Sequence, residues 1–434
     1  MELTLLSIGT TLATKVAPIA IAILFFGLII LIHEFGHFIF AKLFGVKVNE
    51  FAIGMGPTIL KKQGKETKYA LRLFPIGGFV AMEGESESSD DERAYCNQKV
   101  WKRMIILSAG AVFNLILGFI VCIFLVSSED LIGTNQILQF YEGSVSSQKL
   151  QEGDEIIEID GKRVFSDYDI SFLMQRNGTG YYDFVVKRDG EKVELDGVPF
   201  AKRTSGNFNY SPDCSIASVS AKLKKAGLKD GDVIVSVNGT SVANGEELMA
   251  AIQADTDYTY DLTVKRGDEE ISFSDVEFMT VTVWDFIILG EEKNVLNVVE
   301  TAFRYSLSMG RMVYLSLFDL IRGQYGLNDL AGPIGTVSVI TDIAETSVVT
   351  ADWTSLFMIM AMITINIGLF NLLPVPALDG GHLFFMFIEL IVRKPIPQKY
   401  ASWIHAAGLV LLLIFMAVIS FSDLWKWISG VGFY

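Results

Sequence analysis

Four long apolar runs constrain the fold of this chain more than any other feature. They cover about residues 16–40, 104–126, 353–373 and 404–421, and a helix crosses the hydrocarbon core of a bilayer with about 20 apolar residues. Mean hydropathy is +0.40 and 51% of the 434 residues are hydrophobic. We therefore expect a polytopic α-helical membrane protein with four transmembrane helices. The first run is not expected to be a cleaved signal peptide, because its flank is barely basic and no small-residue cleavage site follows.

Basic residues orient these spans. Lys and Arg concentrate in the loop after the first run and again at 393–399, and basic loops stay in the cytoplasm. Both termini and the long acidic segment between the second and third runs should therefore lie outside. The net charge of −15 argues against a nucleic-acid partner, since phosphate binding needs concentrated positive charge. The three cysteines fall in different compartments, so no intramolecular disulfide is expected.

The outer segment contains a repeat. LQEGDEIIEIDGKRV at 150–164 and LKDGDVIVSVNGTSV at 228–242 each read as a turn, a strand and a second tight turn. Each is followed by a possible short helix, at 166–175 and 245–253, and by another strand. The order is typical of two copies of one small α+β domain.

These copies resemble the PDZ domains of bacterial membrane-associated proteases. The resemblance implies two extracytoplasmic PDZ-like domains, over 130–200 and 208–282, able to bind an extended peptide by strand addition. No clear carboxylate-binding loop is evident, and two β-rich spacers forming a steric screen are the alternative. An amphipathic helix on the outer membrane surface and a linker are expected over 294–345, because charges recur there among apolar residues.

The end of the first apolar run carries the pattern HExxH. Residues i and i+4 share one face of a helix, so His33 and His37 can reach one zinc ion while Glu34 acts as general base on a zinc-activated water. The structural alternative has these histidines bonding neighbouring helices. It requires burying an ionisable trio in lipid without a metal to compensate, and intramembrane ionisable groups are functional-site candidates by default.

A catalytic zinc site usually takes three protein ligands. The first and third spans both run from outside to inside, so the cytoplasmic end of the third span should lie level with the two histidines. Asp379 is the carboxylate of that region, and His382 is a rival ligand. Pro374 and Pro376 break the helix there, and irregular backbone at membrane depth is tolerated where it lines a wet cavity.

HEFGH and NLLPVPALDGG together are similar to the paired signatures of the site-2 protease family of intramembrane zinc metalloproteases, and the layout resembles its bacterial regulator of sigma-E protease branch. The resemblance extends over FAIGMGP at 51–57, LFPIGGFV at 73–80 and LAGPIG at 330–335. It implies zinc ligation by His33, His37 and Asp379, with Glu34 as the base. Ala111 departs from the pattern, since relatives often carry proline there.

A substrate helix must be unwound and held extended before it is cut. Residues 67–83 predict a membrane-associated β-hairpin broken at Gly77 and Gly78, and the resemblance implies a sheet edge there that pairs with substrate. An ordinary cytoplasmic hairpin is the alternative. Asn371 either bonds the substrate backbone or joins helices, as membrane asparagines commonly do.

Asn114 and Asn366 are interpreted as contacts between helices. The domain boundaries that follow from these expectations are 1–126 for the N-terminal membrane part and 353–434 for the C-terminal membrane part, on either side of the outer segment.

The expected function is regulated intramembrane proteolysis of single-span membrane proteins such as anti-sigma factors and signal-peptide remnants, after trimming by another protease. Zn²⁺ and the lipid bilayer are the expected partners, with no small-molecule cofactor. The expected location is the bacterial cytoplasmic membrane. A catalytically silent membrane scaffold with PDZ domains is the alternative, although it has no need of the four site residues together. A zinc transporter would distribute acidic residues or histidines over several spans, and the fourth span has only His405.

Overall fold

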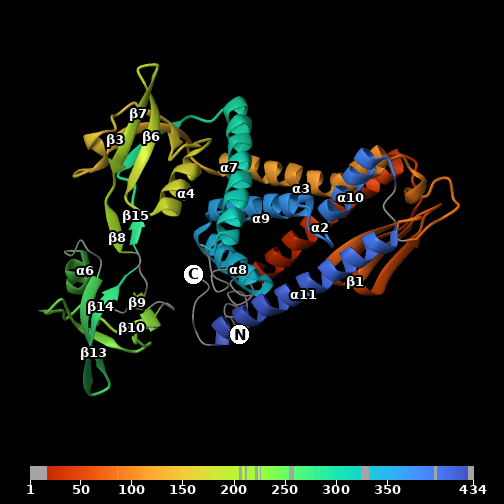
Figure 1. Ribbon diagram of the computed structural model, residues 1–434. Coiled ribbons are helices and arrows are strands. Elements are labelled where there is room, and N and C mark those ends of the chain that lie inside the picture. The colour runs from red at the N-terminus through yellow and green to blue at the C-terminus, as the bar shows by residue number, and fades with distance from the viewer. Residues whose placement is uncertain are drawn as a thin grey trace, which may run out of the picture. The chain divides into compact units, whose positions relative to one another are not determined.

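The computed structural model of the protein is shown in Figure 1. It describes residues 17–85, 87–204, 208–210, 213–219, 223–224, 226–253, 259–278, 280–323, 332–394 and 398–428. Both chain ends and the first two residues of LAGPIG lie outside this set. The chain forms two compact units, one of residues 1–132 and 292–421 and one of residues 133–291 and 422–434.

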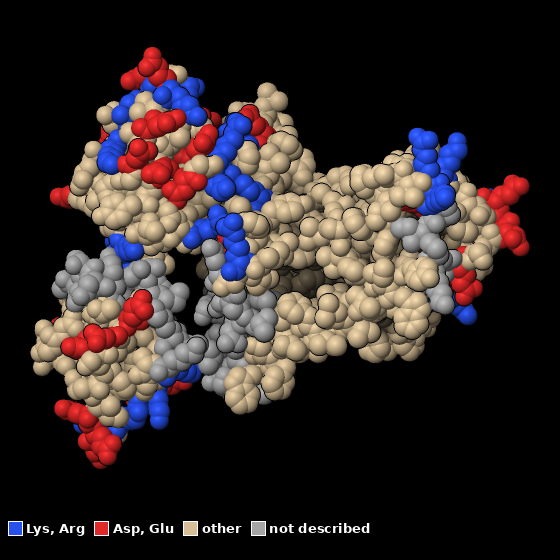
Figure 2. All heavy atoms as spheres, in the orientation of Figure 1, with Lys and Arg blue, Asp and Glu red and all other residues tan. Residues whose placement is uncertain are grey.

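Four helices in the described residues are long and apolar enough to cross a membrane. They are α2 (Ala17–Leu43), α3 (Val100–Ser128), α9 (Thr354–Leu372) and α11 (Gln398–Ile428). Each of the four expected spans thus forms a long apolar helix, and four such helices indicate a multi-pass membrane protein. Figure 2 shows a surface that suits such a protein, because on the visible face the described body of the helical unit is almost free of charged side chains between its two ends.

Helix α3 is the centre of the helical unit, with α2 and α9 packed against it. Glycines make the close approaches possible. A Cβ added at Gly36 of α2 would lie 2.5 Å from the carbonyl oxygen of Ala109, and one at Gly118 of α3 would lie 2.5 Å from Ile365. Small residues of this kind let backbones approach where lipid supplies no hydrophobic drive for helix association.

Two helices fill positions where no helix was expected. Helix α8 (Pro333–Thr350) includes residues for which the sequence predicted a linker. It buries Ile340 and Ala344 against Phe25 of α2. Its valines, isoleucines and threonines lower helix propensity, so tertiary packing decides its conformation. Helix α10 (Asp379–Val392) follows the proline-rich loop after α9.

Helix α7 (Val295–Ile321) is amphipathic, and Asn294 caps its first turn. One face packs on α3 and α9 through buried residues that include Ala302 and Tyr305. Val295 and Leu296 on its first turn are 81% and 83% exposed. In Figure 1, α7 crosses the ends of α3 and α9. Its location at a membrane surface stays a prediction.

The sheet beside the first span has more strand than the sequence predicted. The hairpin expected within residues 67–83 is not formed. These residues are one long strand, β2 (Lys68–Met82), and its partner is β1 (Val48–Gln63), which the sequence did not predict. Ala52 of β1 lies between Ala70 and Phe79, so the two ends of β2 flank the same stretch of β1. Strand β1 was not predicted from the sequence, because FAIGMGP contains glycines and a proline, which are depleted in strands.

The second unit contains the two expected copies of an α+β fold. The first has β3 (Ile132–Phe140), β4 (Glu155–Ile159), β5 (Lys162–Arg163), α4 (Asp167–Asn177), β6 (Tyr181–Arg188) and β7 (Glu191–Pro199). The second has β10 (Ile216–Val219), β11 (Val233–Val237), β12 (Thr240–Ser241), α6 (Gly245–Gln253), β13 (Thr259–Arg266) and β14 (Glu269–Glu277).

The same buried ion pair supports both copies. Arg188 donates two hydrogen bonds to Asp154, at 2.7 and 2.8 Å, and Arg266 donates two to Asp232 at the same distances. Burial alone would raise the pKa of Asp232, but the hydrogen bonds from Arg266 and from the Lys229 amide outweigh it and lower that pKa. The copies therefore share side-chain contacts as well as strand order.

The first copy is completed by residues that follow the second. Strand β16 (Phe286–Glu291) joins the edge of the first sheet beside β3, in the order β16-β3-β4-β6-β7. Short strands β8 (Lys202–Thr204) and β15 (Thr280–Thr282) pair with each other where the chain enters and leaves the second copy. The expected boundary at residue 200 therefore omits one strand of the first sheet.

Candidate metal centre

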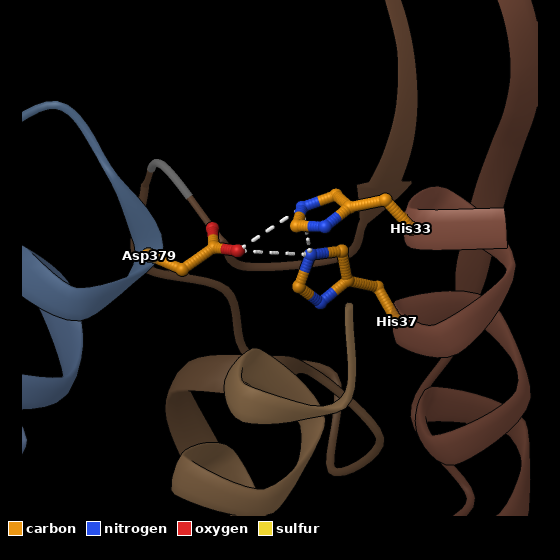
Figure 3. A group of neighbouring side chains, drawn as sticks. All are labelled: His33, His37 and Asp379. Carbon is orange, nitrogen blue, oxygen red and sulfur yellow. Dashed lines mark hydrogen bonds and ion pairs between the residues drawn. The ribbon is translucent and has the colours of Figure 1, made fainter. Parts of the chain in front are cut away.

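Three side chains from two distant parts of the chain converge on one point (Figure 3). His33 and His37 lie one turn apart on α2, and Asp379 is the first residue of α10. Oδ2 of Asp379 lies 3.2 Å from Nε2 of His33 and 3.3 Å from Nε2 of His37. The two Nε2 atoms are 3.2 Å apart. The sequence prediction that topology brings this aspartate level with the histidines agrees with this geometry.

This triangle has the size that a tetrahedral zinc ion requires. Zinc bonds of 2.0–2.2 Å to nitrogen and oxygen imply separations of about 3.3 Å between neighbouring ligand atoms. No hydrogen bond within the described residues satisfies the buried Oδ2 of Asp379, although it lies close to both rings. Two imidazoles and a carboxylate are also a usual donor set for catalytic zinc. The three residues fit a zinc ion with one coordination position left open.

The loop between α9 and α10 directs Asp379 toward the histidines. Pro374 and Pro376 prevent α9 from continuing, and the chain turns back on itself before α10 begins. A Cβ at Gly380 would lie 2.1 Å from the carbonyl oxygen of Leu373, and one at Gly381 would lie 2.5 Å from that of Val375. The two glycines after Asp379 are therefore required for this tight turn.

Each histidine also contacts α3 through its second ring nitrogen. Nδ1 of His37 lies 2.8 Å from the carbonyl oxygen of Ile106, to which it donates. Nδ1 of His33 lies 3.4 Å from Nδ2 of Asn114, while Oδ1 of Asn114 is buried without a partner among the described residues. Exchanging the two amide atoms lets Nδ1 of His33 donate to Oδ1. Both histidines then present Nε2 to the centre, as ligand orientation by outer hydrogen bonds requires.

Asn114 is thus a site residue that the sequence analysis assigned to helix contacts. It lies on α3, which carries no acidic or histidine side chain, and a single membrane asparagine gives no signal of its partner. Asn114 is far from HEFGH in the sequence, and it comes close to His33 only because α3 packs on α2.

Gly110 of α3 lies directly against the two imidazoles. A Cβ at this position would lie 2.4 Å from Nε2 of His37 and 2.9 Å from Cε1 of His33. Real side chains do not approach so closely, so one ring would have to move. Because Gly110 has no side chain, the two imidazole rings can occupy their positions at the centre.

We predict that Gly110→Ala weakens zinc affinity by at least about tenfold, the range seen when support of a metal ligand is lost. The added methyl group displaces the Nε2 atom that points to the centre. Competition with a chelator measures the effect. Gly27→Ala on α2 is the matched control, because a Cβ there meets no atom within 4 Å. Equal affinities for the two variants would contradict the geometry.

The remaining predicted site residues lie around the triangle but do not belong to it. Gly78 of β2 lies beside Glu34, since a Cβ at Gly78 would lie 3.0 Å from Cγ of that glutamate, whereas Gly77, with φ of +83°, packs on Met55. Asn371 lies in the last turn of α9, half-buried, and its side chain makes no hydrogen bond to the described residues. His382 stacks on His405 at 3.6 Å between ring centroids and is absent from the triangle.

Comparison with known proteins agrees with this geometry. The family model described as peptidase family M50 matches residues 21–415. A Clostridium acetobutylicum protein named as a zinc metalloprotease is 31% identical over 407 residues, which cover 93% of this chain and 96% of that protein. The regulator of sigma-W protease RasP of Bacillus subtilis is 28% identical over 448 residues, covering 93% and 97%.

A solved structure of the HtrA3 PDZ domain is similar over 19% of this chain and 84% of that domain, with 24% identity. Its TM-score of 0.15 is too low to assign a fold. The PDZ character of the two copies stays a prediction.

Proposed function

Because this chain belongs to peptidase family M50, we propose that it is an endopeptidase that cuts the transmembrane segments of single-span membrane proteins. The membership confirms the family that HEFGH and LDGG indicated, and the chain is a zinc metalloprotease. The convergence of His33, His37 and Asp379 beside Glu34 is the observation that carries the proposal.

In the proposed reaction the protein holds zinc through Nε2 of His33, Nε2 of His37 and Oδ2 of Asp379. A zinc ion held there would polarise the scissile carbonyl and lower the pKa of water, so that hydroxide would be available as the nucleophile near neutral pH. Glu34, next to His33 on α2, takes the proton of the attacking water and delivers it to the leaving amine. Ile106 and Asn114 keep both rings in the orientation that this requires.

The edge of the β1–β2 sheet supports binding of an unwound substrate. The end of β2 from Gly78 to Met82 pairs on one side with β1, and no other described strand pairs with its second side. An extended peptide added there would gain the backbone hydrogen bonds it lost on unwinding. Because Gly78 lies against Glu34, the added strand would pass the general base.

The apolar neighbourhood supports a hydrophobic substrate. An open cavity of about 500 Å³ lies between α3 and α10, lined by Met104, Pro374, Gly380 and Phe384 among others. It begins at the residue after Asp379, so a side chain flanking the cut bond could occupy it. Asn371 is proposed to bond the substrate backbone from the end of α9.

We predict that Gly78→Ala slows cleavage without releasing zinc. The new Cβ would lie 3.0 Å from Glu34 and 3.1 Å from the carbonyl oxygen of Ala52, so it disturbs the base and the strand edge but no zinc ligand. Metal analysis and cleavage kinetics on the same preparation separate the two effects. Unaltered kinetics would remove this edge from the substrate path.

The basic loops support a cytoplasmic-membrane protein with the active site toward the cytoplasmic side and both α+β copies outside. Copies placed above the active site would exclude substrates with bulky outer domains. Substrates would then need trimming by another protease first, and anti-sigma factors and signal-peptide remnants are the proposed classes. The RasP relative is itself named as a regulator of sigma-W protease.

Purified protein tested against a panel of single-span proteins, with and without their outer domains, tests this function. About one zinc per chain is expected, as a single catalytic site requires, together with cleavage of the trimmed forms only. Binding of the panel without any cleavage by zinc-loaded protein would instead favour a silent scaffold.

A further inference from the structure

The fourth span contacts the loop that carries Asp379, and it does so through a side chain. Nδ1 of His405 on α11 accepts a hydrogen bond of 3.0 Å from the backbone N–H of Ala377, two residues before Asp379. No zinc ligand lies on α11, and in the sequence His405 was only a residue at the edge of the span. This contact therefore has no role in the function proposed so far.

Each backbone N–H of residues 373–378 has an acceptor. Leu373 donates to Phe370, Val375 to Leu373, and Leu378 to Val375, while the two prolines have no N–H. Ala377 is the one amide of this loop whose acceptor is a side chain on another helix. A backbone N–H without an acceptor is costly at membrane depth, so His405 completes the hydrogen bonding of the loop.

Ala377 also has an unusual backbone conformation. Its φ is +77°, a region that residues with a Cβ rarely adopt and that glycine adopts freely. Such a conformation persists where the surroundings hold it in place. The hydrogen bond to His405 acts directly on this residue, so it favours the one conformation that continues into α10 at Asp379.

Helix α11 is shaped to make this contact. A Cβ at Gly408 would lie 2.3 Å from Cβ of Pro376, so the missing side chain there lets α11 approach the loop. The His405 ring stacks on His382 of α10, with 3.6 Å between centroids and 9° between planes. It also lies against Gly381, where a Cβ would be 3.1 Å from its Cε1. His405 thus contacts the chain on both sides of Asp379.

We propose that His405 is a positioning residue for the metal centre, acting through Ala377 to hold the carboxylate of Asp379 at the two histidines. This inference rests on the proposed function, because it assumes that Asp379 is a zinc ligand. It adds the fourth span to the parts of the chain that determine zinc affinity.

The test measures zinc affinity by competition with a chelator, and cleavage, on the full-length protein. His405→Leu keeps most of the side-chain volume but has no acceptor, and we expect about tenfold weaker zinc binding, as for other supporting partners of metal ligands. His405→Asn places its amide oxygen near the position of Nδ1, so affinity close to that of the wild type is expected. Leu411→Ala, which removes an exposed side chain of the same helix, is the matched control.

Ala377→Gly provides a rescue. Glycine adopts the positive φ without help, so combining this substitution with His405→Leu should restore part of the lost affinity, although the N–H of residue 377 still lacks its acceptor. A purely structural contact of α11 would respond to the volume of the side chain, and glycine at residue 377 would not repair it. Unchanged affinity in His405→Leu, or no rescue by Ala377→Gly, overturns the proposal.

Failure of the role proposed for His405 can be distinguished from failure of the proposed function. Wild-type protein that binds no zinc and cuts nothing refutes the function itself. Wild-type protein that binds zinc, with His405→Leu and Leu411→Ala binding equally well, refutes only the role of His405. If His405→Leu does not fold, weak zinc binding by folded His405→Asn also refutes that role.

Discussion

Glu34→Gln is expected to keep its zinc and to lose cleavage of a membrane-embedded substrate by roughly 10²- to 10⁴-fold, the usual contribution of a general base. Glutamine has the shape of glutamate but cannot accept a proton from water. The three proposed ligand atoms belong to other residues, so metal content should not change. Zinc analysis and cleavage kinetics on one preparation measure both quantities.

Glu300→Gln is the matched control, since Glu300 is an exposed glutamate on α7 whose side chain pairs with Arg304. It should cut at the wild-type rate. Undiminished cleavage by Glu34→Gln would assign the proton transfer to a different group and would leave Glu34 without a role in the mechanism.

Asp379→Ala should weaken zinc affinity by more than the 10- to 100-fold that loss of a supporting partner costs. It removes one of the three atoms of the triangle, and two imidazoles on one helical turn bind zinc poorly without a third ligand. Dialysis against a chelator followed by metal analysis measures the loss. Asp342→Ala on α8 is the control, because that exposed aspartate lies outside the triangle.

His382 is the residue most able to contradict this result. Full zinc occupancy in Asp379→Ala would mean that another group completes the site, and His382 lies one turn further along α10. In the structure its ring stacks on His405, so it would have to leave that contact to reach the metal. The double variant Asp379→Ala with His382→Ala would then lose the metal.

The metal centre could be predicted from the sequence because its signals are local or topological. HEFGH places two histidines on one helix face by spacing alone, and the alternation of spans brings the LDGG stretch to the same depth. Gly110, Asn114 and His405 carry no such signal. Their roles depend on which helix faces meet, and an isolated glycine, asparagine or histidine in an apolar run does not reveal its neighbour.

The same distinction applies to the fold. The four spans follow from length and hydropathy, and the two α+β copies follow from a repeated pattern of turns and strands. Helix α8 and strand β1 were missed, since β-branched residues in α8 and glycines in β1 give local preferences that tertiary packing overrides. Strand β16 was missed because its partner β3 lies across an entire second copy.

The position of β16 determines when the sheet of the first copy can be completed during synthesis. The ribosome completes residues 133–199 well before residues 286–291. Strand β3 of the first copy therefore lacks its partner β16 until the second copy has been synthesised. A truncated fragment ending near residue 200 would expose the backbone groups of β3 to foreign strands. Any shortened version of this protein made for biochemical work should therefore begin before β3 and extend beyond Glu291.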